Sequence, residues 1–241
     1  MNCSDASAVI VAGGKGERLG GDVRKQYLNL GGMSILGHTL CTFASLEEIG
    51  EIVVVAPGGD VEYIKNSLIP AELGRLALGK TISVVAGGMS RQESARAGLA
   101  ALNPRSRVVL VHDAVRPFTQ KRHILQVLKK ARECGGSILA VPVRDTLKHC
   151  ENGYVTRTTS RDGLYAAQTP QAFDAAKLRH AHDLAARQGI AATDDAALFE
   201  ELGYEVAIVE GSVRNIKITT EEDLALARAM LEASGFNNED C

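Results

Sequence analysis

The sequence has no tryptophan, and aromatic residues make up only 4% of its 241 residues. Proteins that bind single-stranded nucleic acid stack bases on aromatic side chains, so this composition argues against such a role. A basic excess is also lacking, because 27 Lys and Arg are set against 29 Asp and Glu, a formal net charge of −2. Duplex-DNA binders normally carry that excess. We therefore expect no nucleic-acid partner.

Long apolar runs are absent as well. No stretch approaches the ~18 uncharged apolar residues that a membrane helix needs, and the apolar run 8–12 is too short for a signal peptide. The five cysteines are scattered without a Cys-x-x-Cys pair, and the six histidines lack the spacing of metal ligands. These absences predict no membrane partner, no dedicated metal site and a cytoplasmic location.

Short apolar runs, rich in β-branched residues, alternate with amphipathic segments along the first 143 residues. The runs cover 8–12, 52–56, 82–86, 108–111 and 138–143, and the segments with helical spacing cover 34–47, 60–68, 90–102 and 119–133. Continuously apolar strands fit a sheet that is buried on both faces, and strand–helix alternation builds parallel βαβ units. The sequence therefore predicts a three-layer α/β fold with a mostly parallel sheet.

The pattern changes after residue 143. Residues 145–165 are polar and predict two strands around Asn152-Gly153, a strong hairpin signal. An isolated hairpin is marginal in water, so we expect this arm to pack against another subunit. Helices are expected at 173–188 and 193–202, strands at 205–209 and 215–218, and a last helix from 219 to about 234. No linker interrupts the chain, which predicts a single domain over 1–241 with a β-arm at approximately 145–168.

Glycines follow the first predicted strand, where an open α/β sheet binds its ligands. Gly13, Gly14 and Gly16 would let backbone N–H groups approach an anion. The loop is not the dinucleotide fingerprint, because Leu19 stands where that motif needs Gly or Ala. It is not a P-loop either, since no Gly-x-x-x-x-Gly-Lys-Ser/Thr is present. A tight turn without a ligand stays open as the alternative.

Charged residues are placed at the same predicted edge of the sheet. Arg18 and Lys25 flank the glycine loop and suit a polyphosphate. Asp113 and Arg116 follow the strand 108–111, where a carboxylate could hold sugar hydroxyls or magnesium and the guanidinium a phosphate. Lys217 alternates with apolar neighbours and points either into a cleft or to solvent. A solvated surface is the alternative for each residue alone, but together they indicate an anionic nucleotide substrate.

A series of motifs follows along the chain: Ala12-Gly13-Gly14-x-Gly16-x-Arg18-Leu19-Gly20, Lys25-Gln26-Tyr27-Leu28, Gly87-Gly88-x-x-Arg91-x-x-Ser94, Val111-His112-Asp113-Ala114-x-Arg116-Pro117, Pro142-Val143-Arg144-Asp145-Thr146-Leu147-Lys148, Ala167-Gln168-Thr169-Pro170-Gln171-Ala172-Phe173, Thr193-Asp194-Asp195-Ala196, and Val209-Glu210-Gly211 before Asn215-Ile216-Lys217-Ile218-Thr219. In this order they resemble the 2-C-methyl-D-erythritol 4-phosphate cytidylyltransferases of the non-mevalonate isoprenoid pathway. The resemblance covers about residues 6–232.

The resemblance implies a Rossmann-like nucleotidyltransferase fold and a homodimer that interlocks through the arm. It implies transfer of CMP from CTP to 2-C-methyl-D-erythritol 4-phosphate, giving 4-diphosphocytidyl-2-C-methyl-D-erythritol and pyrophosphate. Magnesium is expected mainly through the CTP phosphates, with no certain protein ligand.

The resemblance also assigns expected roles to residues that match the family's motifs. The expected catalytic residues are Arg18, Lys25 and Lys217. CTP is expected to contact Ala12, Gly13, Gly14, Gly16, Gly88, Met89, Ser94, Asp113 and Ala114. Methylerythritol phosphate is expected to contact Asp113, Arg116, Thr146, Arg161, Thr169 and Lys217, with Arg161 and Thr169 reaching the partner subunit's substrate from the arm.

Two residues depart from the family's pattern. Arg24 stands where the family usually has Pro, and Tyr165 stands where it commonly has Trp. The segment 115–118 also leans toward ribitol 5-phosphate cytidylyltransferases, which makes ribitol phosphate the alternative acceptor. Arg24 motivates a second alternative, a nucleotide-binding module without catalysis. An NAD-dependent oxidoreductase is disfavoured, because the second strand does not end in the acid that holds the ribose.

Overall fold

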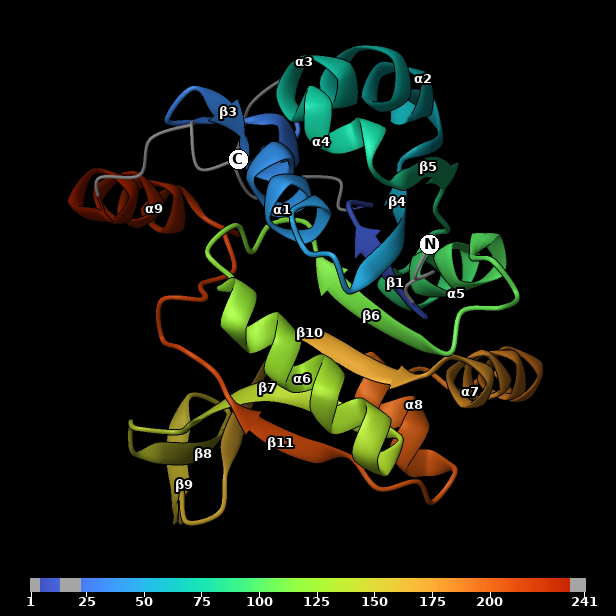
Figure 1. The fold of residues 1–241 in the computed structure, drawn as a ribbon. Coiled ribbons are helices and arrows are strands. Elements are labelled where there is room, and N and C mark those ends of the chain that lie inside the picture. Colours follow the sequence, from blue (N-terminus) through green and yellow to red (C-terminus); the bar gives the residue numbers. More distant parts are fainter. Residues whose placement is uncertain (1–4, 14–22, 235–241) are drawn as a thin grey trace.

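The structure is a computed structural model that describes residues 5–13 and 23–234. Figure 1 shows a twisted central sheet with helices on both faces. The sheet has seven strands in the order β11-β7-β10-β6-β1-β4-β5. Every neighbouring pair is parallel except those of β10, which runs antiparallel to both β6 and β7. This mostly parallel, three-layer α/β architecture confirms the predicted fold class.

The strands of the central sheet are β1 (Ala6–Val11), β4 (Ile49–Ala56), β5 (Thr81–Ala86), β6 (Val108–Asp113), β7 (Gly136–Pro142), β10 (Tyr165–Asp174) and β11 (Ala207–Glu210). Two small hairpins add β2 (Asn29–Leu30) with β3 (Met33–Ser34), and β8 (Leu147–Glu151) with β9 (Tyr154–Thr159). The α-helices are α1 (Ile35–Ala44), α2 (Val61–Tyr63), α3 (Ile69–Leu73), α4 (Arg75–Leu78), α5 (Arg91–Ala101), α6 (Lys121–Cys134), α7 (Ala175–Gln188), α8 (Asp195–Glu201) and α9 (Glu221–Ser234). Short 3-10 turns cover Lys25–Tyr27 (η1) and Gly58–Asp60 (η2), and a π-helical turn (η3) covers Ile64–Leu68.

The two faces of the sheet bury different apolar clusters because neighbouring residues of a strand point to opposite faces. In β1, Ala8 and Ile10 pack with residues of α1 and α6, such as Leu40 and Val127. Val9 packs on the other face with Leu99 of α5 and its neighbours. A sheet covered in this way explains why the strands are apolar without interruption, as the sequence predicted.

Strand β10 was not predicted, because its polar residues and Pro170 do not fit a central strand. Proline has no N–H to donate to a ladder and is normally confined to edges and bulges. Here it lies inside an irregularity: the pairing of β10 with β7 shifts between Ala167 and Gln171. The pairing with β6 covers only Gln171 to Asp174. The polar segment is therefore held in the sheet but freed from the regular ladder, next to the end of β6.

The strand predicted at 215–218 was wrong, because this segment is an irregular loop. Its polar groups bond to the β6–α6 connection instead of a neighbouring strand. The Asn215 carbonyl accepts from Arg116 Nη1 at 2.7 Å, and Ile218 N–H donates to the Val115 carbonyl at 2.9 Å. This loop brings the neighbourhood of residue 217 to the carboxyl end of β6.

The predicted hairpin is confirmed as β8–β9, a separate two-stranded sheet that projects at one end of the molecule (Figure 1). Asn152 and Gly153 have φ values of +51° and +84°, the left-handed conformations that a tight Asn-Gly turn requires. Tyr154 and Val155 next to the turn are 79% and 61% exposed. Among the described residues, no helix combines the length and apolar character needed to span a membrane.

Candidate active site

A cleft of about 260 Å³ opens at the carboxyl ends of β1, β5 and β6. We call it the first cleft. Both lysines that the sequence singled out, Lys25 and Lys217, line it, although they lie 192 positions apart in the chain. The complete lining is Val11, Ala12, Gly13, Lys25, Gln26, Gly88, Met89, Ser90, Arg91, Ser94, Asp113, Val115 and Lys217. Of the positive side chains expected to converge, Lys25 and Lys217 therefore share this pocket.

The glycines that follow β1 and β5, which we call the glycine tips, lie close to the Ser94 hydroxyl. A Cβ atom on Gly13 would lie 3.1 Å from Ser94 Oγ, and one on Gly87 only 2.6 Å from it. The Ser94 hydroxyl donates to the Ser90 carbonyl at 2.9 Å and accepts from Gly88 N–H at 3.2 Å. A hydroxyl has one proton and two lone pairs, so Ser94 keeps one lone pair for a donor group in the cleft.

The segment that carries Lys25 is tied to the end of β1. Gln26, which is 1% exposed, donates from Nε2 to the Ala12 carbonyl at 2.8 Å. Arg24 Nε lies 3.0 Å from Asp60 Oδ2, so this arginine pairs with η2. The φ of Arg24 is −64°, close to the value that proline fixes. The backbone at position 24 is therefore compatible with the proline that the family usually has there.

Asp113 forms the centre of the site at the end of β6. Its carboxylate contacts Lys217 Nζ at 2.7 Å, Arg91 Nε at 3.0 Å and Arg116 Nε at 3.9 Å. Burial by itself raises the pKa of the Asp113 carboxyl, but the three cations outweigh it and hold that pKa well below its usual range. Asp113 is therefore ionised at neutral pH and acts as a fixed anchor for three positive side chains.

Behind this anchor lies a pair that sequence reasoning left without a role. Arg91 Nη1 contacts Asp195 Oδ2 at 2.8 Å, and His182 Nε2 lies 2.9 Å from Asp195 Oδ1. Burial disfavours the charge of Arg91, but the carboxylates of Asp195 and Asp113 raise its pKa above the usual value. The available signal in the sequence was position: Arg91 is the first residue of α5, three positions after Gly88, and Asp195 is the first residue of α8.

A second cleft of about 240 Å³ lies on the other side of the same ion cluster. It shares Arg91, Asp113 and Lys217 with the first cleft. Its further lining is Arg116, Ala167, Gln168, Thr169, Gln171, Thr193 and Asp194. Two clefts that share one cluster of charges can hold two anionic substrates with their reacting groups close together.

Thr169 lies in this second cleft of its own chain. It is 5% exposed and sits in β10 of the central sheet, where its Oγ1 lies 3.0 Å from His112 Nδ1 and accepts from Asp113 N–H at 3.1 Å. The expectation that Thr169 reaches outward from the arm is wrong, because the arm ends before β10 enters the sheet. The Thr169 carbonyl accepts from Asn215 Nδ2 at 2.9 Å, which fixes its backbone.

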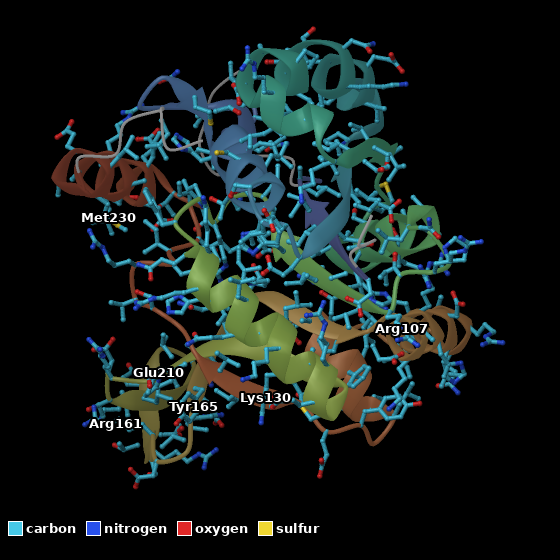
Figure 2. The ribbon with its side chains drawn as sticks, in the orientation of Figure 1. Arg107, Lys130, Arg161, Tyr165, Glu210 and Met230 are labelled. Carbon is cyan, nitrogen blue, oxygen red and sulfur yellow. The ribbon has the colours of Figure 1, made fainter. Side chains whose placement is uncertain are left out.

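Some predicted residues are not brought to either cleft. Ala114 is fully buried, and its N–H and carbonyl are bonded to Val11 and Thr39. Thr146 and Arg161 are exposed, and Arg161 bonds to the Arg144 carbonyl. Figure 2 shows Arg161 with Tyr165 at the hairpin end of the molecule, away from Arg107. Gly14, Gly16 and Arg18 lie outside the described residues.

The described residues contain no group of three or more histidine, cysteine or carboxylate side chains that could hold a metal ion. The only carboxylate in the described lining of the first cleft is Asp113, which is already engaged by three cations. Magnesium binds through one or two carboxylates together with substrate phosphates. The donor set fits a divalent ion that arrives with a triphosphate better than one resident in the protein.

Comparison with known proteins adds independent findings. Residues 6–233 match the family model described as 2-C-methyl-D-erythritol 4-phosphate cytidylyltransferase. The chain is 42% identical over 229 residues to a protein of that name from Geotalea uraniireducens, covering 94% of this chain and 97% of the relative. It is 43% identical to one from Halalkalibacterium halodurans, covering 93% and 96%.

Solved structures are similar as well. A 4-diphosphocytidyl-2C-methyl-D-erythritol synthase from Anaerococcus prevotii superposes with a TM-score of 0.82 at 35% identity, covering 94% of this chain and 96% of the other. A 2-C-methyl-D-erythritol 4-phosphate cytidylyltransferase from Thermus thermophilus gives a TM-score of 0.75 at 34% identity, covering 94% and 98%.

Proposed function

This chain belongs to the 2-C-methyl-D-erythritol 4-phosphate cytidylyltransferase family, and we propose from that premise that its first cleft binds CTP and its second cleft binds the acceptor. The enzyme transfers CMP from CTP to 2-C-methyl-D-erythritol 4-phosphate. The products are 4-diphosphocytidyl-2-C-methyl-D-erythritol and pyrophosphate, in isoprenoid precursor biosynthesis. The observation that carries the assignment of clefts is the ion cluster around Asp113, which both clefts share.

The reaction requires charge neutralisation more than proton transfer. An oxygen of the acceptor phosphate forms a bond to the α-phosphorus of CTP, and the bond from that phosphorus to the pyrophosphate oxygen breaks. The nucleophile is already ionised, so no strong general base is needed. Lys25 and Lys217 line the cleft where this charge would develop, and preorganised cations lower the barrier most where charge accumulates. Arg18 has the same expected role by its motif.

Asp113 would hold the cations that it contacts in place between the two substrates. Its carboxylate keeps Lys217 and Arg91 together at the boundary of the clefts, although their like charges repel each other. Arg116 faces the second cleft and is available to the acceptor phosphate. When such groups hold both reactants in place, the bimolecular reaction becomes effectively unimolecular. This positioning would accelerate the reaction in addition to the charge neutralisation.

The base would lie near Ser94 and the glycine tips. Cytosine carries a 4-amino donor at the position where uracil carries a carbonyl acceptor. Since the Ser94 proton is already donated to Ser90, its remaining lone pair suits the amino group of cytosine. Gly13, Gly88, Met89 and Ala12 would complete the nucleoside site. Magnesium, bound through the triphosphate, would supply further charge neutralisation when present.

The arm is proposed to join two copies of the chain. Tyr154 and Val155 are exposed apolar residues on a two-stranded sheet, which is marginal in water by itself. A second copy packed against them would bury this surface and bring Arg161 toward the partner's acceptor. We propose a homodimer of single-domain subunits over 1–241, located in the cytoplasm.

The ribitol 5-phosphate alternative is not favoured, because the family model and the relatives reported above carry the methylerythritol name. Pyrophosphate release from CTP should be measured with each acceptor in the presence of magnesium. We expect rapid release with methylerythritol phosphate and little with ribitol phosphate. Lys25→Ala and Lys217→Ala should nearly abolish the release of pyrophosphate, whereas Lys65→Ala, at an exposed position of η3, should not. Equal turnover in all three variants would refute the assignment.

A further inference from the structure

His112 is a buried imidazole next to the ion cluster, and it has no part in the mechanism above. It is 0% exposed, and its ring packs against Phe43 with centroids 4.9 Å apart. Its Nε2 lies 3.2 Å from the Arg116 carbonyl, and its Nδ1 lies 3.0 Å from Thr169 Oγ1. Both ring nitrogens are thus committed to specific partners, one on each side.

These partners determine which nitrogen carries the proton. A carbonyl oxygen can only accept, so His112 Nε2 must be the nitrogen that donates. Burial of the imidazole lowers the pKa of His112 to about 3, so the ring is neutral at pH 7 and carries a single proton. His112 Nδ1 is therefore a bare acceptor, and the Thr169 hydroxyl must donate to it.

The hydroxyl of Thr169 is then almost fully used within the protein. Its proton goes to His112, and one lone pair accepts from Asp113 N–H at 3.1 Å. One lone pair is left, and Thr169 lines the second cleft. Toward a bound molecule Thr169 can therefore accept a hydrogen bond but cannot donate one.

We propose that Thr169, with its proton held by the positioning residue His112, recognises a hydroxyl group of the acceptor polyol and not its phosphate. A phosphate oxygen is itself an acceptor, so it would face a lone pair with no proton between them. A polyol hydroxyl has the proton that the site lacks. The phosphate has better partners in the same cleft, where Arg91, Arg116 and Lys217 provide positive charge.

This inference rests on the proposed function, and acceptors that each lack one hydroxyl test it. For each deoxy analogue of methylerythritol phosphate, the ratio of kcat/KM for the parent to kcat/KM for the analogue is measured. With wild type we expect one analogue to show a loss of roughly two- to twelvefold, the range for one neutral hydrogen bond. Thr169→Val should lower kcat/KM for the parent and bring the ratio for that analogue close to one.

Three comparisons separate recognition from a structural role. Thr169→Ser keeps the hydroxyl and should keep the wild-type ratio. Thr42→Val deletes a hydroxyl that bonds only within α1, to the His38 carbonyl, and should change no ratio. A merely structural effect of Thr169→Val would lower the rates for all acceptors equally and leave every ratio at its wild-type value, which would overturn the proposal.

The positioning role of His112 has its own readout. His112→Phe removes the acceptor for the Thr169 proton, so the ratio should fall toward that of Thr169→Val, with no further fall in the double variant. The ¹⁵N shifts of labelled His112 in the unmutated protein report the tautomer without any substitution. A proton on Nδ1 at pH 7 would overturn the assignment. If wild type makes no cytidylyl product from the parent acceptor, the proposed function fails first and separately.

Discussion

Replacing Asp113 with asparagine tests whether one carboxylate holds the site together. The side chain of Asp113 is 8% exposed and lies 2.7 Å from Lys217 and 3.0 Å from Arg91. Removing one partner of a buried ion pair typically costs 3–5 kcal/mol. The side chain of Lys217 is 40% exposed, so solvent weakens its contribution to the ion pair with Asp113. Arg91 keeps Asp195 as a partner when Asp113 is replaced. We therefore expect a loss near the lower end, about 3 kcal/mol of unfolding free energy at pH 7.

The loss should depend on pH in a defined direction. The cations around Asp113 hold its pKa below the unfolded value of about 3.9. A depressed pKa in the folded state contributes stability above the unfolded pKa, and that contribution disappears as the pH falls through the folded pKa. The difference between wild type and Asp113→Asn should thus be full above about pH 5 and shrink steadily below about pH 4.

Urea unfolding at several pH values measures this difference. With an m-value of about 1–3 kcal/mol/M, a loss of about 3 kcal/mol lowers the urea midpoint at pH 7 by about 1–3 M. Asp183→Asn, an exposed carboxylate on α7, serves as the matched control and should change the midpoint little. A difference that stayed constant from pH 7 to pH 3, or an unchanged midpoint at pH 7, would refute the view of Asp113 as a charged anchor.

Further predictions concern catalysis, packing, the family departure and assembly. Lys217→Met should slow pyrophosphate release roughly 10²–10³-fold, as for loss of one preorganised group; a rate within twofold of wild type would contradict its role. Gly98→Ala should cost about 1–3 kcal/mol in urea unfolding, because its Cβ would lie 2.4 Å from a Val9 methyl, and an unshifted midpoint would count against this packing. Arg24→Pro should leave the free energy of unfolding almost unchanged, since the φ of Arg24 already suits proline. The substitution gains about 0.4–1 kcal/mol from a less flexible unfolded chain, and this offsets the loss of the partly exposed Arg24–Asp60 ion pair, worth about 0–1 kcal/mol. A large drop in the melting temperature would show that this ion pair contributes more. Tyr154→Asp should convert the proposed dimer to a 25.6-kDa monomer in sedimentation equilibrium, and a wild type that is already monomeric would refute the proposed interface.

Regular elements could be predicted because their patterns are local. The apolar runs at 8–12 and 52–56 became the paired strands β1 and β4, and the amphipathic segment 119–133 became α6. The Asn152-Gly153 turn needed only two residues to be identified. For the strands and the helix, burial on one or both faces produces a characteristic spacing of apolar residues that can be recognised in the sequence.

The site was predicted only in part, because its geometry depends on contacts between distant segments. Lys217 was expected on a strand, but it is a loop residue whose ammonium is held by Asp113. Thr169 was placed beside the arm, since a strand with Pro170 near its middle contradicts the usual pattern. Arg91 belongs to the motif Gly87-Gly88-x-x-Arg91-x-x-Ser94, but the neighbouring sequence does not indicate that its side chain bridges Asp113 and Asp195.

The charge balance of the cluster explains why these contacts belong together. Arg91, Arg116 and Lys217 carry three positive charges against the single charge of Asp113, with Asp195 neutralising part of the excess from behind. The full chain has a net charge of −2, so its positive potential is local and not general. Without Asp113, the three cations would repel one another in a partly buried space. With Asp113 and Asp195 present, the three cations still outnumber the two carboxylates that contact them, so a positive charge remains to attract phosphate-bearing substrates. Asp113 at the boundary of the two clefts, with Asp195 behind it, therefore meets two requirements. The folded protein needs its cations paired, and the proposed reaction needs a remaining positive charge.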